Sequence, residues 1–265
     1  MYSTPQLLLK YLRYYFTASN SKGHGMHSPF VFEFITKILN DKNDYTEYEK
    51  VESLRRQLLN DNVILEVEDF GAGSVIDKKN KRSISSIAKN AAKPRKFGQL
   101  LFRMVKHYQP VTILELGTSL GITTSYLSLA KPDGRLITME GSGEIADTAK
   151  QNFKTIGLKN VELIEGNFDH TLASVVRGLS TVDFSFIDGN HRQEPTERYF
   201  KQILAKTNND SILVFDDIHW SSEMEAAWET IKKDDAATCS IDLFFIGIVF
   251  FRKEFKEKQH FVIRF

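Results

Sequence analysis

The sequence has very little of what disulfide-bonded, zinc-binding or membrane-spanning proteins need. Cys239 is the single cysteine among 265 residues, so no disulfide can form within the chain, and no cluster of Cys and His has the spacing of a structural zinc site. No apolar run reaches the roughly 20 residues that a helix needs to cross a bilayer. We therefore expect a protein of the reducing cytoplasm with no transmembrane segment.

An excess of one charge is also lacking. Lys and Arg together number 35, and Asp and Glu number 34, which gives a formal net charge of +1. Because such a chain has no strong field to attract polyanions, nucleic acid is disfavoured as the main substrate. Hydrophobic residues make up 42% of the chain, enough for a substantial core, so a disordered or fibrous protein is excluded.

The first 95 residues have the pattern of helices joined by loops. Helices are predicted over residues 4–18, 30–39 and 45–60. Pro94 then interrupts the chain, and the pattern changes after it. We predict two regions: a helical extension over residues 1–95 and an α/β domain over residues 96–265.

Two segments of the extension leave alternatives open. The helix around residues 6–16 has apolar side chains on more than one face, which favours docking on its own domain or on a second copy in a homodimer over lying on a membrane surface. Asp69-Phe70-Gly71-Ala72-Gly73-Ser74 imitates a cofactor-binding glycine motif, but no convincing strand-helix unit follows it. We interpret it as a loop or lid.

After residue 95, helices and strands alternate, which is typical of a parallel sheet covered on both faces. Strands are predicted over residues 112–117, 135–140, 161–165, 182–188 and 211–217. Helices are predicted over residues 97–107, 122–130, 143–156, 169–178, 195–205 and 221–233. Two further apolar runs, 241–251 and 260–265, follow without a helix between them, so the last strand is predicted to run antiparallel to the others.

This order resembles the class I S-adenosylmethionine-dependent methyltransferases over about two-thirds of the chain. The resemblance implies a Rossmann-like, doubly wound sheet of seven strands that closes with an antiparallel C-terminal hairpin.

Glycines stand at the turn between the first strand and its helix, where open α/β sheets bind ligands. Gly117 would let the backbone turn tightly and approach a ligand, and Gly121 would let the helix start close to the strand. The spacing G-x-x-x-G differs from the G-x-G-x-x-G that binds a pyrophosphate, so a cofactor without phosphate fits better than a dinucleotide. Glu140 ends the second strand, where a carboxylate can accept hydrogen bonds from both ribose hydroxyls.

The family resemblance extends this set. It implies that Glu115 lies near the methionine part of S-adenosylmethionine and that Asn167 and Phe168 lie near its adenine. The full set of predicted cofactor-binding residues is Glu115, Gly117, Thr118, Ser119, Gly121, Glu140, Gly141, Asn167, Phe168 and Asp188.

Acidic residues end two neighbouring strands: Asp188 after the fourth, and Asp216 with Asp217 after the fifth. Carboxylates that converge at one sheet edge repel each other, and a bound divalent cation relieves this. All-oxygen ligation suits Mg²⁺ or a similar ion. Asp188 also has a structural alternative, because strand-end aspartates often cap the next helix.

With these acids, the resemblance narrows to metal-dependent O-methyltransferases that act on small molecules. The catechol and caffeoyl-type branch has Asn as its third ligand and a Lys after the first Asp, whereas this sequence has Asp217 and His191. In these two residues the sequence is closer to the sugar O-methyltransferase branch. His191 is the predicted general base that accepts the proton of the acceptor hydroxyl, and His219 is the second candidate for this role. Each histidine has the alternative of holding a catalytic residue in position or of being an ordinary loop residue.

The leading hypothesis is therefore a metal-assisted enzyme that methylates a hydroxyl of a small molecule. A nucleotide-dependent oxidoreductase and a non-catalytic module that binds the cofactor or a partner are the alternatives. A dinucleotide fingerprint would favour the first alternative, and loss of the clustered acids would favour the second.

Overall fold

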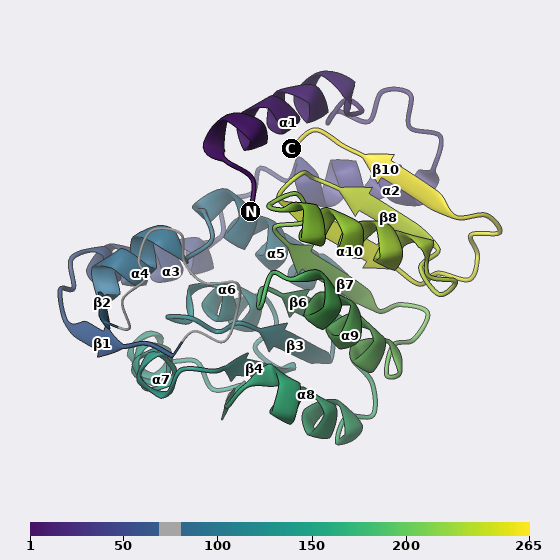
Figure 1. Ribbon diagram of the computed structural model, residues 1–265. Coiled ribbons are helices and arrows are strands. Elements are labelled where there is room, and N and C mark those ends of the chain that lie inside the picture. The colour runs from purple at the N-terminus through teal and green to yellow at the C-terminus, as the bar shows by residue number, and fades with distance from the viewer. Residues whose placement is uncertain (69–80) are drawn as a thin grey trace. The chain divides into compact units, whose positions relative to one another are not determined.

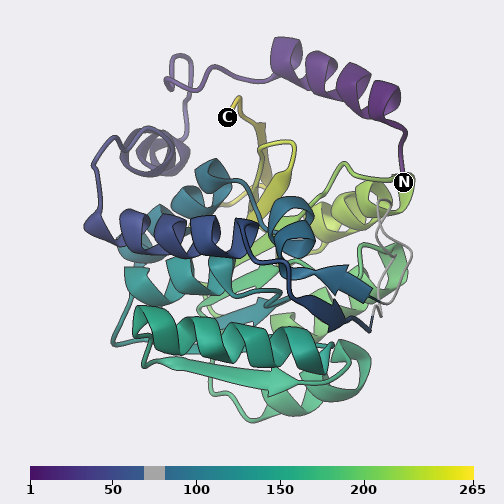
Figure 2. The same cartoon turned by 90° about the vertical axis from the view of Figure 1, so that its left-hand side faces the viewer.

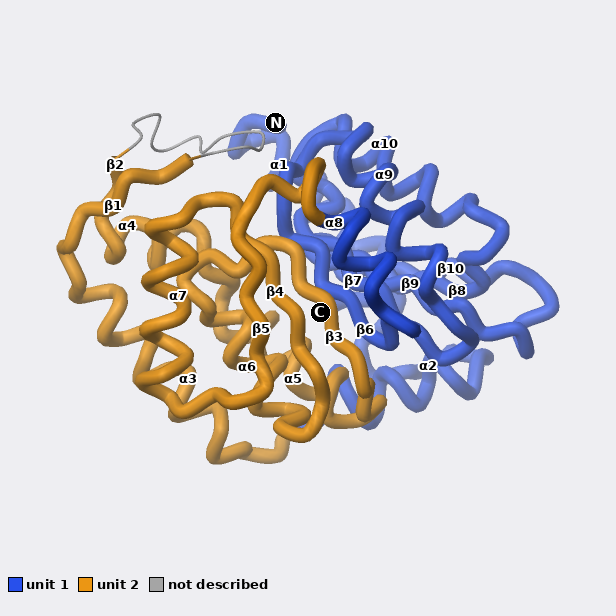
Figure 3. Tube along the Cα trace, turned by 90° about the horizontal axis from the view of Figure 1, so that it is seen from below, with its two compact units in different colours: residues 1–41, 172–265 blue, residues 42–171 orange. Residues whose placement is uncertain are grey.

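The computed structural model describes residues 1–68 and 81–265 and divides them into two compact units (Figure 3). One unit comprises Met1–Asp41 and Leu172–Phe265, and the other comprises Lys42–Thr171. We call them the split unit and the central unit. The motif from Asp69 to Ser74 lies outside the described residues, and the predicted division at residue 95 stays a prediction.

From residue 95 onward, the central unit alternates helices and parallel strands (Figure 1). Its elements are α3 (Thr46–Leu59), β1 (Ile64–Glu66), β2 (Lys81–Ser83), α4 (Ile84–Asn90), α5 (Arg95–Tyr108), β3 (Thr112–Leu116), α6 (Ile122–Ala130), β4 (Arg135–Glu140), α7 (Gly143–Ile156), β5 (Val161–Glu165) and the first turn of α8 (Phe168–Arg177). The strands lie in the order β3-β4-β5, all parallel, and β1 and β2 form a small antiparallel pair. The pair β1-β2 was not predicted, because its strands have three residues each and follow no apolar alternation.

Helix packing in the central unit depends on small and aromatic residues. A Cβ at Gly98 of α5 would lie 2.6 Å from the Tyr126 ring of α6, so only glycine permits this close approach. Tyr48 of α3 packs against both Tyr126 and Phe102, with ring centroids 5.9 and 5.0 Å away. Apolar residues of β3 and β4 are fully buried, and α7 packs along β4 and β5, so this part of the sheet has the predicted buried parallel character.

The split unit combines the N-terminal helices with the C-terminal part of the chain. Its elements are α1 (Thr4–Thr17), α2 (Pro29–Phe34), the π-helix η1 (Ile35–Leu39), the rest of α8, β6 (Phe184–Ile187), α9 (Gln193–Leu204), β7 (Ile212–Asp216), α10 (Ser222–Lys233), β8 (Cys239–Asp242), β9 (Ile246–Phe250) and β10 (Gln259–Val262). The strand order is β10-β8-β9-β7-β6.

Helices cover both faces of this strand group. A Cβ at Gly247 would lie 2.7 Å from the Trp228 ring of α10, and Phe215, which pairs with Gly247, also contacts Trp228. Phe250 is three residues from Gly247 and so points to the opposite face, where Phe30 of α2 meets it at 4.9 Å between ring centroids. The doubly wound α/β class predicted from the sequence is confirmed.

The C-terminal strands differ from the prediction in number and direction. In the part of the chain that the structure describes, the larger sheet has eight strands rather than the predicted seven, and β10 runs parallel to β8 rather than antiparallel to the rest. The antiparallel strand is β9, which pairs with β7 on one side and β8 on the other. The cause is a tight turn inside the apolar run: Phe244 has φ 70° and its N–H donates to Asp242 Oδ1, so the run forms two strands.

None of the helices among the described residues is long and apolar enough to cross a membrane.

Candidate active site

The loop between β3 and α6 has a backbone that few sequences can adopt. Gly117, Ser119 and Gly121 all have positive φ, at 99°, 48° and 81°. A Cβ at Gly121 would lie 2.4 Å from the Phe153 ring. The N–H groups of Gly117 and Thr118 both donate to the carbonyl of Met139 in β4, which ties the loop to the neighbouring strand. Glycine is therefore needed at the two positions that the sequence singled out.

Glu115 supports this loop from inside the fold. Its carboxylate is fully buried and accepts hydrogen bonds from Thr124 at 2.5 Å and Thr138 at 2.6 Å. Thr138 is also 2.6 Å from the hydroxyl of Thr118, so the buried charge connects through two hydroxyls to the loop. Burial with charge-assisted hydrogen bonds fixes Glu115 in place. Its predicted contact with a cofactor stays a prediction.

Glu140, at the end of β4, holds the backbone on both sides of the strand end. Its two carboxylate oxygens accept the N–H groups of Ser119 at 2.8 Å and Ser142 at 3.0 Å. Each oxygen of a carboxylate has a second acceptor position. Glu140 and the following Gly141 are half-buried, so further donors can approach from solvent. The arrangement suits the predicted binding of two hydroxyls.

Asn167 and Phe168 follow β5. The Asn167 side chain accepts the N–H of Asp169 at 2.9 Å, and its carbonyl accepts the N–H groups of His170 and Thr171. Asn167 therefore caps α8, and the half-buried Phe168 begins that helix. The predicted roles of both residues beside adenine stay predictions.

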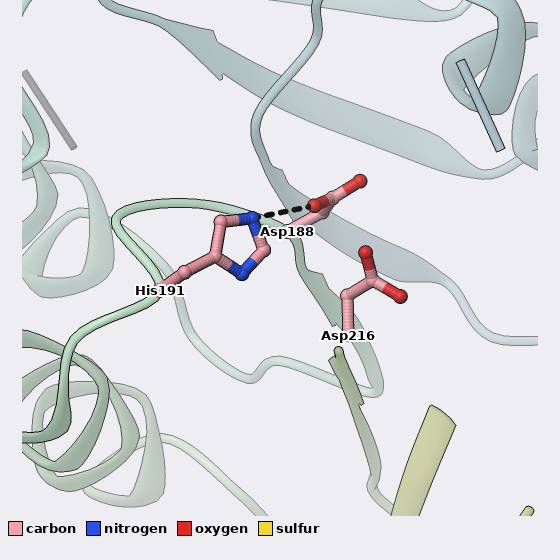
Figure 4. A group of neighbouring side chains, drawn as sticks. All are labelled: Asp188, His191 and Asp216. Atoms are coloured by element: carbon pink, nitrogen blue, oxygen red, sulfur yellow. Dashed lines mark ion pairs between the residues drawn. The ribbon is translucent and has the colours of Figure 1, made fainter. Parts of the chain in front are cut away.

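In the split unit, three predicted residues come together. Asp188 after β6, His191 in the following loop and Asp216 at the end of β7 each offer a ligand atom, and these atoms all lie within 4.8 Å of one another (Figure 4). His191 Nε2 lies 3.3 Å from Asp188 Oδ1. Asp216 is buried, whereas Asp188 and His191 are partly exposed. The group therefore has one oxygen donor inside the fold and two donors that solvent can reach.

Backbone strain is concentrated around this group. Asn190, His191 and Asp217 have φ values of 68°, 47° and 52°, which residues other than glycine rarely adopt. Such strain is often stored at functional sites, where surrounding contacts must maintain it. The ring of Trp220 lies 5.6 Å from that of His191 and supports the loop from one side.

Asp217, predicted as the third carboxylate ligand, is not in the group of three. Its N–H donates to the carbonyl of Phe245 at 2.7 Å, and its left-handed backbone follows from this turn. His191 offers the third possible ligand atom of the group, and its predicted role as a base stays a prediction. The spacing Asp188-x-x-His191 was the available signal for this pairing, because a loop can return a side chain three residues on to the strand end.

His219, the competing candidate base, has both ring nitrogens in contact with carboxylates. Nδ1 lies 3.0 Å from Glu225 Oε1, and Nε2 lies 2.8 Å from Asp242 Oδ2. Burial alone would lower the pKa of His219, but hydrogen bonds and charge attraction from Asp242 and Glu225 outweigh it, so the pKa is raised. Glu225 also accepts from Lys10 and Tyr2 of the N-terminal segment. Both ring nitrogens of His219 therefore have carboxylate partners within the fold, and its predicted role as a base stays a prediction.

The comparisons with known proteins point to one class. Residues 114–218, less than half of the chain, match a family model described as a methyltransferase domain. The catechol O-methyltransferase of Niastella koreensis is 33% identical over 126 residues, which cover 46% of this chain and 55% of that protein. The chain spans at most about half the length of the curated relatives it matches.

Solved structures agree in fold. The SAH-bound methyltransferase PaMTH1 of Podospora anserina aligns with a TM-score of 0.59 and 15% identity, over 85% of this chain and 97% of that one. The O-methyltransferase of Bacillus cereus in complex with SAH aligns with a TM-score of 0.54 and 19% identity, over 83% of this chain and 97% of that one. Together with the methyltransferase family model and the catechol O-methyltransferase relative, this fold confirms the predicted resemblance to class I S-adenosylmethionine-dependent O-methyltransferases.

Proposed function

We propose that this protein transfers a methyl group from S-adenosylmethionine to a hydroxyl group of a small molecule, with a divalent cation held in the split unit. The observation that carries the proposal is the convergence of Asp188, His191 and Asp216. The matching methyltransferase domain and the SAH-bound structures of similar fold support the choice of cofactor.

The cofactor part of the proposal rests on the central unit. The loop from Gly117 to Gly121 begins and ends with glycines of positive φ, which suits the close approach of a ligand to the backbone. Glu140 would accept hydrogen bonds from the ribose hydroxyls, in addition to those from Ser119 and Ser142. Asn167 and Phe168 would border the adenine, as the family resemblance implies.

The metal part rests on donor type and spacing. Two carboxylates and one imidazole, with donor atoms within 4.8 Å of one another, fit the coordination sphere of one divalent ion. The nitrogen donor favours Mn²⁺ or a later transition metal over the Mg²⁺ expected from the sequence, because Mg²⁺ prefers oxygen ligands. When bound, such an ion would lower the pKa of the acceptor hydroxyl and fix its position.

His191 has two chemical roles open to it. As a base, its Nε2 would receive the proton of the acceptor hydroxyl, and Asp188 at 3.3 Å would stabilise the resulting imidazolium. The acceptor oxygen would then form its bond to the methyl carbon as the carbon–sulfur bond of the sulfonium breaks, leaving S-adenosylhomocysteine. As a ligand, His191 would instead hold the cation together with Asp188 and Asp216.

The first test is calorimetric titration of S-adenosylhomocysteine into the full chain. Glu140→Ala should weaken binding by about 10- to 100-fold, as expected for the loss of charge-assisted hydrogen bonds. Glu165→Ala is the matched control, because Glu165 pairs with Glu140 in the parallel register and ends the adjacent strand. Absence of binding to the folded wild-type protein would reject the cofactor proposal. Equal weakening by the two variants would reject the role of Glu140.

The second test measures Mn²⁺ binding and methyl transfer in an acceptor screen. Asp188→Asn should abolish both, whereas Asp210→Asn, an exposed aspartate before the opposite end of β7, should change neither. His191→Gln separates the two roles: weaker Mn²⁺ binding identifies a ligand, and retained binding with a lost ionisation in the pH–rate profile identifies a base. Full activity without any divalent ion would contradict metal assistance.

A further inference from the structure

The N-terminal helix α1 has two apolar faces, of which its own unit covers one. Leu7, Tyr11 and Tyr14 pack against Phe244 and Phe245. The hydroxyl of Tyr14 donates to the carbonyl of Ile263 and accepts the N–H of Phe265. Figures 1 and 2 both draw the C-terminal end of the chain beside α1. This face is the docked face, and it fixes the orientation of the helix.

The second face consists of Leu8, Leu9, Leu12 and Phe16 and is exposed. Leu9 and Phe16 are 70% and 76% exposed, far more than an apolar side chain of a packed helix. At about 100° per residue, these four side chains fall within an arc of about 100°. Tyr15, also exposed, borders this arc on one side, and Arg13 borders it on the other. The arc is a continuous stripe rather than scattered exposed residues.

The charged residues of the N-terminal segment that carries this stripe are of one sign. Residues 1–32 contain Lys10, Arg13 and Lys22 and no Asp or Glu, although the whole chain has 34 acidic residues against 35 basic ones. Lys10 is paired with Glu225, but Arg13 and Lys22 are exposed. Arg264, from the C-terminal end, lies 4.4 Å from the centroid of the Tyr15 ring and adds a further cation beside the stripe.

We propose that the exposed face of α1 binds the surface of a membrane that contains anionic lipids. A helix with leucine and phenylalanine on one side and basic residues at its borders lies in the headgroup region and buries its apolar face by about 5–10 Å. The cations Arg13, Lys22 and Arg264 complement the negative surface potential. The helix does not have to unfold or leave its unit, because the docked face remains covered.

A second copy of the chain fits this face less well. An antiparallel pair of α1 helices packed through this stripe would bring the Arg13 side chains that border it towards each other, and no acidic residue of either helix would offset them. A stable dimer also buries about 800 Å² on each partner, from 20–30 residues, which is more than one stripe of four or five side chains provides. Membrane binding therefore accounts for both the stripe and its charge.

The experiment is flotation of the full-length protein with vesicles. One set contains phosphatidylcholine with about one phosphatidylglycerol in three lipids, and the other contains phosphatidylcholine alone. We expect the protein to float with the anionic vesicles and about tenfold less with the neutral ones, and we expect added salt to weaken the binding. No flotation with anionic vesicles would overturn the proposal.

Two variants and a control locate the binding face. The double variant Leu9→Gln with Phe16→Gln should reduce binding about tenfold or more, and Arg13→Glu should reduce it for anionic vesicles. The control is Val63→Gln with Val111→Gln, which removes two valines that are 58% and 67% exposed in the other unit. Binding that the control reduces as much as the α1 variant would overturn the assignment.

Sedimentation velocity without lipid completes the test. All variants should have the sedimentation coefficient and melting temperature of the wild type, since only exposed side chains change. A wild-type dimer that the Leu9→Gln and Phe16→Gln variant dissociates would assign the stripe to a second copy and overturn the proposal. Neither measurement depends on enzymatic activity, so the result is independent of the proposed function.

Discussion

The glycine loop of the central unit and the acidic group of the split unit carry charge in different ways. Glu115 and Glu140 each accept two hydrogen bonds from hydroxyls or N–H groups of their own fold. Asp188 and Asp216 instead converge with His191, so two carboxylates lie close to each other and to one imidazole. The loop is organised to hold its shape, whereas the acidic group is the place at which we propose that a cation binds.

The largest expected effect comes from breaking the shape of the loop. Gly121→Ala places a Cβ against the Phe153 ring at a residue with φ 81°, so we expect the free energy of unfolding to fall by about 3 kcal/mol, from backbone strain and overpacking together. Gly157→Ala is the control, since Gly157 has φ 76° but nothing within 4 Å of its added Cβ. It should cost about 1 kcal/mol. Urea unfolding measures both, and equal losses would show that the Phe153 contact has no effect.

Ligand-induced stabilisation sharpens the contrast between the two regions. S-adenosylhomocysteine and Mn²⁺, each at about 100 times its Kd, should each raise the stability by about 2.7 kcal/mol through mass action. Glu140→Ala, with its binding weakened 10- to 100-fold, should reduce the effect of the first ligand to about 0.4–1.4 kcal/mol and keep that of Mn²⁺. Asp216→Asn should lose the effect of Mn²⁺ and keep that of S-adenosylhomocysteine. Differential scanning calorimetry gives the shifts in Tm. A variant that loses both effects would show that the two sites are not separate.

Substitution of histidines in the split unit tests whether His219 belongs to the group of Asp188, His191 and Asp216. His219→Gln leaves Asp242 and Glu225 without the imidazole between them, so the free energy of unfolding should fall by about 2 kcal/mol. Mn²⁺ binding should be unchanged. His260→Gln, which removes one contact with Ser240 at the surface, should cost under about 1 kcal/mol. Loss of Mn²⁺ binding in His219→Gln would place His219 in the metal site.

The smallest expected effect is a dependence of stability on acid pH. Burial alone would raise the pKa of Glu225, but hydrogen bonds from Tyr2, Lys10 and His219 outweigh it and lower the pKa below its ordinary value of 4.5. A lowered carboxyl pKa contributes stability above pH 4.5, which is lost as the pH falls through the folded-state pKa. Urea unfolding between neutral and acid pH should show a shallower decline for Glu225→Gln than for the wild type. Identical declines would contradict the prediction.

Local patterns predicted the central unit more closely than the C-terminal strands. The predicted bounds of α6, β4 and α7 match the structure to the residue. In these elements the spacing of the apolar residues and the glycine or serine at the boundaries indicate the same ends. The run from residue 241 to 251 gave no such boundary. Its turn at Phe244 depends on the side chain of Asp242 and not on glycine or proline, so the hairpin was placed too late.

Some features of the candidate site were likewise predictable from the sequence, and others were not. The strand-end positions of Asp188 and Asp216 followed from strand order, and the structure brings both acids together. The exclusion of Asp217 from that group depends on a left-handed backbone that no local rule assigns to aspartate. The contacts of His219 join residues 6 and 23 positions away on two other elements, so only the folded chain reveals them.

The docking of α1 has a consequence for biosynthesis. Tyr14 is made 249 residues before Ile263, to which it donates its hydrogen bond. At about 5–20 residues per second, a ribosome needs about 12–50 s to complete that interval. During this time both apolar faces of the nascent helix are uncovered. After folding the docked face is covered, and the stripe of Leu8, Leu9, Leu12 and Phe16 remains exposed. Helix α1 is thus made long before the residues on which it docks, and its docking must await Ile263, which follows β10.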